Sequence, residues 1–284
     1  MDLSTLAASI YADFNAIPKR ELLMFYGDNG SGKTKLAIEV AHDITPVGKK
    51  ILYVDTSAGY ETINNHPDLY RVVASRLLVL PFVGEDQLNS LAGAIAAKAA
   101  PFDTIGTVLL DESSSMAQQY LDVVVEARSR ADRAKESDKA DWPDYNIAGN
   151  KWRKTVQKFE RIQGVSLIEV AHQRSDIRRK IEFISPAFQP TVGNETRKEK
   201  RGIFYCDKRL FQVNGKEVNA FVVQTDKDDH VLAKTRIYVD GIPMPPVTTP
   251  EVVKRGIKQD YEARIVHNEP NYNTYINSEP VEVD

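Results

Sequence analysis

The sequence predicts an α/β fold in which a mostly parallel sheet is flanked by helices and extended by antiparallel strands toward the C-terminus. Apolar runs typical of strands alternate with helical patterns, and they cover residues 21–26, 49–55, 76–82, 104–110 and 165–172. This alternation is typical of a parallel sheet covered on both faces. From about residue 202 the runs become short, and Asn214-Gly215 is a strong hairpin turn, which predicts antiparallel strands.

Helical patterns and proline positions divide the chain into three parts. Residues 1–19 predict a short helical segment that Pro18 closes. Residues 20–240 hold the predicted strands and, among other helical patterns, an alanine-rich helix over 86–100. Residues 241–284 are rich in proline and polar side chains and end in an acidic stretch, so we expect a flexible tail or one draped over the surface.

Composition and charge exclude several classes of protein. Apolar residues make up 42% and charged residues 27% of the 284, which is typical of a folded soluble chain. The net charge of −3 excludes a generally basic nucleic-acid binder but leaves room for local basic patches. The single cysteine, Cys206, excludes an internal disulfide and favours a reducing, cytoplasmic compartment. No membrane span or signal peptide is predicted, and Cys206 is expected to be a buried apolar residue rather than a nucleophile.

Residues 27–34, GDNGSGKT, fit the phosphate-binding pattern G-x-x-x-x-G-K-[ST]. Glycines let consecutive backbone N–H groups point at phosphate oxygens, and the following helix adds its free N–H groups. Lys33 would lie between the β- and γ-phosphates of a nucleotide, and Thr34 would place its hydroxyl on Mg²⁺. The alternative is a glycine turn with a surface lysine. The predicted nucleotide-binding residues are Gly27, Asp28, Asn29, Gly30, Ser31, Gly32, Lys33, Thr34 and Lys35.

Acidic and polar side chains follow two later strands. Asp111 and Glu112 end the run at 104–110, where Asp111 would hold Mg²⁺ through water and Glu112 would polarise the attacking water. Two predicted strands separate this point from the phosphate loop, which suits the branch of phosphate-loop proteins in which a glutamate activates water. His172 and Gln173 end the fifth run and are predicted to sense the γ-phosphate. The alternatives are solvated acids at a strand end and a histidine bonded to backbone.

At this point the sequence resembles the RecA-like P-loop ATPases, and more narrowly the phage-encoded nucleotide-binding family that includes the Sak-type single-strand annealing proteins. The resemblance covers about residues 20–240, and its segments are GDNGSGKT, KKILYVDT, DTIGTVLLDE, the run from YNIAGNKW to GVSLIEVAHQ, and AKTR. It implies a RecA-like core, ATP and Mg²⁺ as cofactors, a homo-oligomeric ring or filament, and a role in phage recombination in the host cytoplasm. It also implies that Lys234 and Arg236 enter a neighbouring subunit's active site, whereas a lone K-x-R is usually two solvated cations.

The resemblance further implies that loops after the fourth and fifth strands bind single-stranded DNA. Residues 174–201 hold eight cations against four acids, namely Arg174, Arg178, Arg179, Lys180, Arg197, Lys198, Lys200 and Arg201. Residues 128–160 hold nine cations against six acids. For residues 128–140, however, a solvated charged helix is favoured over a DNA-binding segment. Cations and stacking aromatic side chains are what binding of a single strand without sequence preference uses. The interleaved aromatic residues are Trp142, Tyr145, Trp152, Phe183 and Phe188.

One position departs from the RecA pattern and leaves three interpretations open. Ser57 stands two residues after Asp55, where RecA has its catalytic glutamate, so Glu112 or Glu61 takes that role or hydrolysis is slow. Three functions remain open: an annealing ATPase, a hexameric helicase or loader motor, and a nucleotide-switched binding module with little hydrolysis. Ser57 favours the last of these. The acidic stretch from residue 268 is a candidate site for a single-strand binding protein or a polymerase.

Overall fold

The computed structural model of the chain describes residues 19–56, 59–131, 139–178, 181–188, 200–213 and 216–266. The helix predicted within residues 1–19 lies outside these ranges except for its last residue. Ser57, the turn at Asn214-Gly215 and the acidic stretch from residue 268 also lie outside them.

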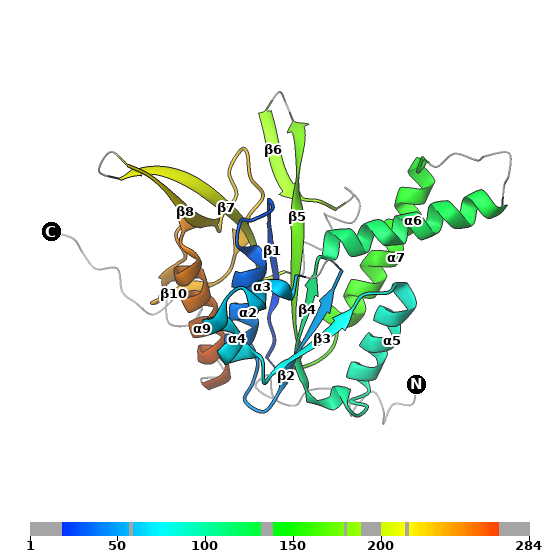
Figure 1. The fold of residues 1–284 in the computed structure, drawn as a ribbon, viewed down its shortest axis with the longest axis horizontal. Helices are drawn as coiled ribbons and strands as arrows, with labels where there is room; N and C mark the ends of the chain where they lie inside the picture. The colour runs from blue at the N-terminus through cyan, green and yellow to red at the C-terminus, as the bar shows by residue number, and fades with distance from the viewer. Residues whose placement is uncertain are drawn as a thin grey trace, which may run out of the picture.

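A ten-stranded sheet forms the centre of the molecule (Figure 1). Its main path has the order β12-β8-β7-β1-β5-β4-β2-β3. The pairings from β3 through to β7 are parallel, and those of β8 with β7 and β12 are antiparallel. The predicted α/β fold with an antiparallel extension is therefore confirmed. The strands of this path are β1 (Leu22–Gly27), β2 (Lys50–Asp55), β3 (Leu77–Pro81), β4 (Ile105–Asp111), β5 (Ser166–Arg178), β7 (Gly202–Val213), β8 (Lys216–Gln224) and β12 (Val247–Thr248).

Several strands differ in length from the predicted ones. β5 continues past its parallel neighbours and pairs with β6 (Ile181–Pro186), so the two form a ribbon that extends beyond the sheet (Figure 1). The runs IFYC and RLFQV, which the sequence suggests as two short strands, are one continuous strand, β7. The run TRIYV is instead divided between β9 (Lys234–Thr235) and β10 (Tyr238–Val239), and β10 pairs with β11 (Ile242–Pro243).

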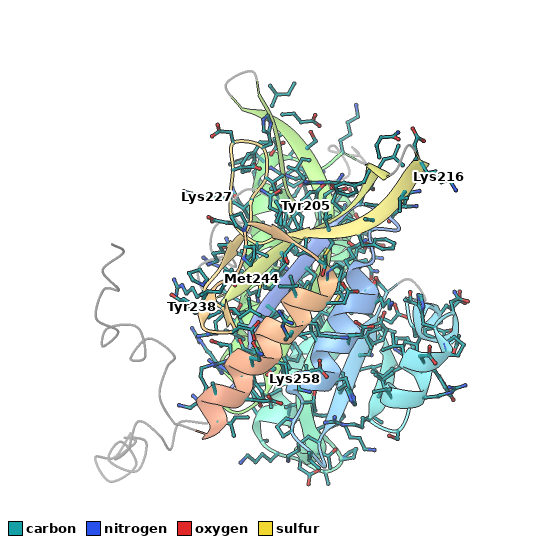
Figure 2. All side chains as sticks on the ribbon, turned by 90° about the vertical axis from the view of Figure 1, so that its left-hand side faces the viewer. Tyr205, Lys216, Lys227, Tyr238, Met244 and Lys258 are labelled. Carbon is teal, nitrogen blue, oxygen red and sulfur yellow. The ribbon has the colours of Figure 1, made fainter. Side chains whose placement is uncertain are left out.

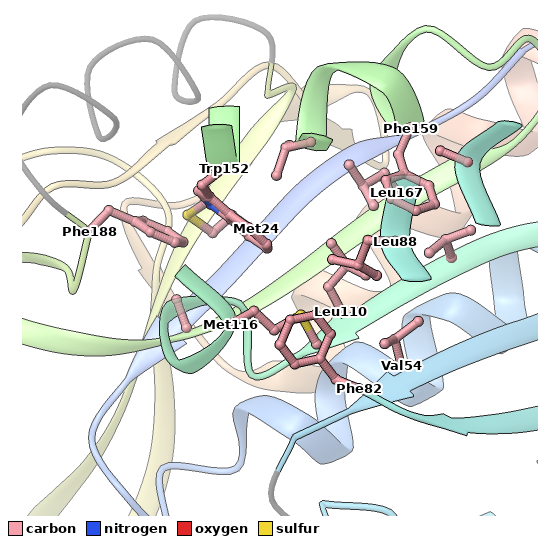
Figure 3. Packing of buried hydrophobic residues seen from close by; sticks show 14 of the residues in the cluster. Met24, Val54, Phe82, Leu88, Leu110, Met116, Trp152, Phe159, Leu167 and Phe188 are labelled. Atoms are coloured by element: carbon pink, nitrogen blue, oxygen red, sulfur yellow. The ribbon is translucent and has the colours of Figure 1, made fainter. Parts of the chain in front are cut away.

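Helices cover both faces of the sheet (Figure 1). One face packs against α2 (Lys33–Ile44), α3 (Glu61–Asn64), α4 (Pro67–Val73) and α9 (Pro250–Val266). The other packs against α5 (Glu85–Ala96), α6 (Ser113–Ala131) and α7 (Trp142–Glu160), and a short 3₁₀ helix, Phe102–Thr104, precedes β4. Figure 3 shows this second core.

The helix α7 illustrates why the sequence forms these elements. Asp141 caps it in a capping box with Asp144, and a proline follows in the first turn, where its missing N–H costs nothing. Ala148, Trp152 and Val156 recur every four residues and are buried against the sheet. Trp152 therefore belongs to the core, which corrects the suggestion that it stacks on DNA bases.

The prediction of a solvated charged helix over 128–140 needs correction in two respects. The predicted helix over 128–140 is helical only as far as Ala131 in the described part, and residues 139–140 are not helical. Arg128 in this stretch is not solvated, because it pairs with Asp141, at 2.9 Å, and with Asp144. Both carboxylates lie at the start of α7, so Arg128 joins α6 to α7.

Part of the stretch from residue 241, which the sequence predicts to be a flexible tail or one draped over the surface, is a regular helix. Residues 250–266 form α9, whose side chains at Val253, Ile257 and Tyr261 are buried against the α2 face of the sheet. These three residues are spaced four apart, which is the period of one helix face. Proline-rich flanks hid this pattern in the sequence.

Lys200 lies in a buried cluster of charges and is not available to DNA, contrary to the prediction. Its side chain is 0% exposed, and its ammonium contacts Glu160 of α7 at 2.8 Å and Glu169 of β5. Burial lowers the pKa of Lys200, but the two carboxylates outweigh it and hold the pKa above its usual value. The cluster joins α7, the central strand β5 and the start of β7.

Replacement of Lys200 by Met should destabilise the fold strongly. Two buried carboxylates would lose their counter-charge, a loss that costs about 3–5 kcal/mol. Lys208→Met on the exposed part of β7 is the matched control and should change the free energy of unfolding by less than about 0.5 kcal/mol. Urea unfolding followed by far-UV circular dichroism measures both, and equal stabilities of the two variants would contradict the role given to Lys200.

Candidate active site

The phosphate-binding loop joins β1 to α2 in a conformation that only glycine accommodates easily. Gly30 and Gly32 have φ angles of +74° and +80°, in the left-handed region. A Cβ atom on Gly27 would lie 2.1 Å from the carbonyl oxygen of Cys206 on the neighbouring strand β7. The Ser31 N–H donates to the Asp28 carbonyl at 3.3 Å and closes the loop.

Lys33 begins α2 directly behind this loop. Gly32 carries no side chain to cap the helix, so the first N–H groups of α2 remain available to an anion. The Lys33 ammonium is nearly buried and donates to the Asp28 carbonyl at 3.2 Å across the loop. Loop, helix end and ammonium therefore converge on one point, which is the arrangement that a polyphosphate requires.

Thr34 and Asp111, the two residues predicted to hold Mg²⁺, lie together. The Thr34 hydroxyl donates to Asp111 Oδ2 at 3.0 Å, and the Tyr53 hydroxyl donates to the same oxygen at 2.6 Å. Hydroxyl and carboxylate oxygens are ligands that suit Mg²⁺, so these residues fit the ion. Burial raises the pKa of Asp111 to about 6. Gly59 is required beside it, because a Cβ atom there would lie 2.8 Å from Asp111 Oδ2.

Glu112 is buried between β4 and β5, where backbone and side-chain donors hold it. Its Oε1 accepts the His172 N–H at 2.7 Å and the Ser114 hydroxyl, and its Oε2 contacts His172 Nε2. His172 lies opposite Gly27 in the register of β5 with β1. Glu112, which follows β4, therefore contacts the residue of β5 that lies beside the start of the phosphate loop, and His172 contacts a carboxylate rather than backbone alone.

The other acids named in the sequence have different surroundings. Asp55 accepts the N–H groups of Gly59 and Tyr60, at 3.0 and 3.4 Å, and so closes the turn before α3. Glu61 is exposed at the first position of α3. Among the acids considered for activating water, Glu112 is the buried one beside the phosphate loop.

The structure separates the residues predicted to bind DNA into groups. Arg201 pairs with Asp260 at 2.7 Å and with Glu21 at 3.2 Å, so it is part of the fold like Lys200. Arg174 pairs with Asp176 and donates to the Phe188 carbonyl, and Arg178 ends β5 at the tip of the ribbon. The remaining four lie outside the described residues: Arg179, Lys180, Arg197 and Lys198.

The interleaved aromatic side chains include both buried and exposed rings. Phe188 is buried in the core like Trp152, so neither presents a ring to a nucleic acid. Phe183 is half-buried on β6. Trp142 and Tyr145, at the start of α7, are 66% and 38% exposed.

Lys234 and Arg236 lie at the end of the sheet away from the phosphate loop. β9 pairs with β7 at Gly202 and Ile203, whereas the loop follows the other end of β1, where Gly27 lies opposite Cys206. Arg236 is exposed, and Lys234 is half-buried. Gln173 pairs in register with Pro186 of β6, and its Oε1 is buried without a hydrogen-bond partner among the described residues.

One part of the site was not found in the sequence. A cavity of about 630 Å³ lies beside the phosphate loop, with walls from α2, β8 and the first turn of α9. The residues that close it, Phe221 and the segment from Thr249 to Glu251, come from a strand and a supposed tail that carry no motif.

The phosphate loop, the Thr34–Asp111 pair and the adjacent glutamate define a P-loop ATPase in which β5 lies between the two motif strands. A family model described as an AAA domain matches residues 20–237, so the chain belongs to this AAA-domain family of P-loop ATPases. No curated protein matches the chain. The match gives no support for the narrower resemblance to Sak-type annealing proteins. None of the helices in the described ranges is both long and apolar enough to span a bilayer.

Replacement of Asp111 by Asn should abolish Mg²⁺-dependent hydrolysis while stabilising the nucleotide-free protein. Because burial raises the pKa of Asp111 to about 6, its ionised form costs roughly 2–3 kcal/mol at neutral pH. The stability of Asp111→Asn should exceed that of the wild type most above pH 6. This difference should disappear as the pH falls toward 4, since the wild-type carboxyl is then protonated. Thermal unfolding of both proteins between pH 4.5 and 8 measures this, and a pH-independent difference would contradict it.

Proposed function

We propose that this ATPase hydrolyses Mg-ATP and couples the reaction to single-stranded DNA in recombination or annealing, as the resemblance to phage proteins suggests. The observation that carries the ATPase part is the convergence of Lys33, Asp111 and Glu112 on the end of the phosphate loop. Support for the DNA part comes from the sequence cations on the β5–β6 ribbon.

Each residue has a defined task in the proposed reaction. Lys33 neutralises charge on the β- and γ-phosphates, and Mg²⁺ between Thr34 and Asp111 supplies further neutralisation when bound. Glu112 orients a water molecule for in-line attack on the γ-phosphorus and takes up its proton as the bond to ADP breaks. His172 and Gln173 follow the same strand end and would respond to the γ-phosphate.

Replacement of Glu112 by Gln should lower kcat for ATP about 10²- to 10⁴-fold, because the general base is lost, while ATP still binds. Phosphate release is measured in the steady state with and without single-stranded DNA, which should stimulate the wild type. Lys33→Ala is the control that should lose binding itself. Unchanged hydrolysis in Glu112→Gln, with no stimulation by DNA, would contradict the catalytic proposal.

That result would favour a second candidate, a nucleotide-switched DNA-binding module. Its supporting observation is that Glu112 is already engaged by His172 and Ser114, so its oxygens are not free to hold water in this conformation. In that case ATP would still change the affinity for DNA without turnover.

Lys234 and Arg236 are proposed to act on the ATP of a neighbouring subunit in a ring or filament. Their position at the far end of the sheet from their own phosphate loop keeps them away from their own site. A cation supplied by a neighbour would stabilise charge on the transferred phosphoryl group and make hydrolysis depend on assembly.

Mixing two inactive variants tests this proposal. Lys33→Ala cannot bind ATP but keeps the cations, whereas Arg236→Ala binds ATP but lacks one of them. In a mixed assembly the first should complete the site of the second, so hydrolysis should exceed the sum of the two separate activities. Activity equal to that sum would place Arg236 outside a shared site. Arg255→Ala, an exposed cation on α9, is the matched control for Arg236→Ala and should retain activity alone.

Single-stranded DNA is proposed to bind at the tip of the β5–β6 ribbon. Arg178 ends β5, and the next two residues of the sequence are Arg179 and Lys180, so three cations follow one another there. Phosphate contacts by such cations do not depend on base sequence.

Replacement of both Arg178 and Arg179 by Ala should weaken binding of oligo-dT and reduce the slope of log Kd against log salt by about 1.4, since two phosphate contacts are removed. Fluorescence anisotropy at several salt concentrations measures this. Replacement of Arg71 and Arg255, exposed cations on α4 and α9, is the control. An unchanged slope in the ribbon variant would move the DNA to another surface.

A further inference from the structure

We propose that the cavity beside the phosphate loop is the seat of the nucleotide base, and that Phe221 is the surface on which the base stacks. The inference rests on the proposed binding of ATP at the loop. It adds residues of β8 and α9, which no sequence motif marks, to the site.

The position of Phe221 is the first argument. A Cβ atom built on Gly32 of the loop would lie 3.4 Å from Phe221 Cδ1, so the ring packs directly against the turn that is expected to hold phosphates. The ring is nevertheless 47% exposed, and it lines the cavity together with Lys33 and Thr34. An exposed aromatic ring next to a phosphate site is an available stacking partner for a base.

The shape of the cavity is the second argument. Its volume of about 630 Å³ lies within the range of small-ligand sites. Leu36 and Pro250 provide apolar surface, and Thr62, Asn219 and Glu251 provide polar groups around it. A mixed lining of this kind suits a flat base and a ribose with hydroxyl groups.

The construction of the walls is the third argument. The β7–β8 ribbon passes above α2 and α9 (Figure 2), and Phe221 and Asn219 lie on the same face of it because their positions differ by two. Lys254 of α9 contacts Glu39 of α2 at 3.3 Å and joins the two helices below the cavity. The walls of the cavity are therefore held in place by contacts within the fold.

The other face of the same ribbon offers a matched control. Phe211 pairs with Val218, three residues along the ribbon from the pair of Lys208 and Phe221, and because this spacing is odd its ring points to the opposite face. It is 43% exposed, close to the exposure of Phe221, and it does not line the cavity.

The experiment compares ATP with inorganic tripolyphosphate, which carries the phosphate chain without a base. Phe221→Ala should raise the Kd for ATP about tenfold or more, as expected for the loss of one stacking contact, and leave the Kd for tripolyphosphate unchanged. Phe211→Ala should change neither. Isothermal titration calorimetry in Mg²⁺ buffer measures both ligands, and thermal unfolding confirms that both variants are folded.

Phe221→Trp gives a second readout, because an indole at this position keeps the stacking surface. It should retain wild-type affinity for ATP, and its added fluorescence should be quenched by ATP but not by tripolyphosphate. An unchanged Kd for ATP in Phe221→Ala, or equal quenching by both ligands, would contradict the proposal that the base binds in this cavity. If the wild type binds neither ligand, the proposed ATP binding itself fails, so the two failures are distinguishable.

Discussion

The hydrogen bond from Thr34 to Asp111 joins the two halves of the site and depends on the order of the sheet. The two residues are 77 positions apart in the sequence, and they meet because α2 follows β1 while Asp111 ends β4, one strand beyond β5. Tyr53 on β2 donates to the same carboxylate from the other side. An acid that is buried this deeply persists as an anion only with such donors, so β1, β2 and β4 must all be in register for it to exist.

Buried charges recur where elements distant in sequence meet. Lys200 holds the C-terminal end of α7 to β5, and Arg201 holds Glu21, before β1, to Asp260 on α9. Such pairs contribute little net stability compared with apolar packing, but they penalise any arrangement that separates them. They fix which strand end meets which helix, and the positions of the active-site residues depend on this arrangement.

The sequence predicted the sheet, the phosphate loop and the two acids because each depends on a short local pattern. It assigned Lys200 to DNA because a lysine in a basic run looks the same whether it is solvated or paired with distant carboxylates. It missed α9 because prolines at both ends outweighed the spacing of Val253, Ile257 and Tyr261. The place of Phe221 depends on the curvature of a ribbon over a helix end, which no local pattern encodes.

The strand β5 is both a wall of the active site and the base of the projecting ribbon. The backbone N–H of His172 holds Glu112, and from Gln173 onward the same strand pairs with β6 alone. Residues 173–178 therefore connect the ribbon directly to the strand position that holds Glu112. A displacement of the ribbon would reach the carboxylate of Glu112 through only six residues of one strand.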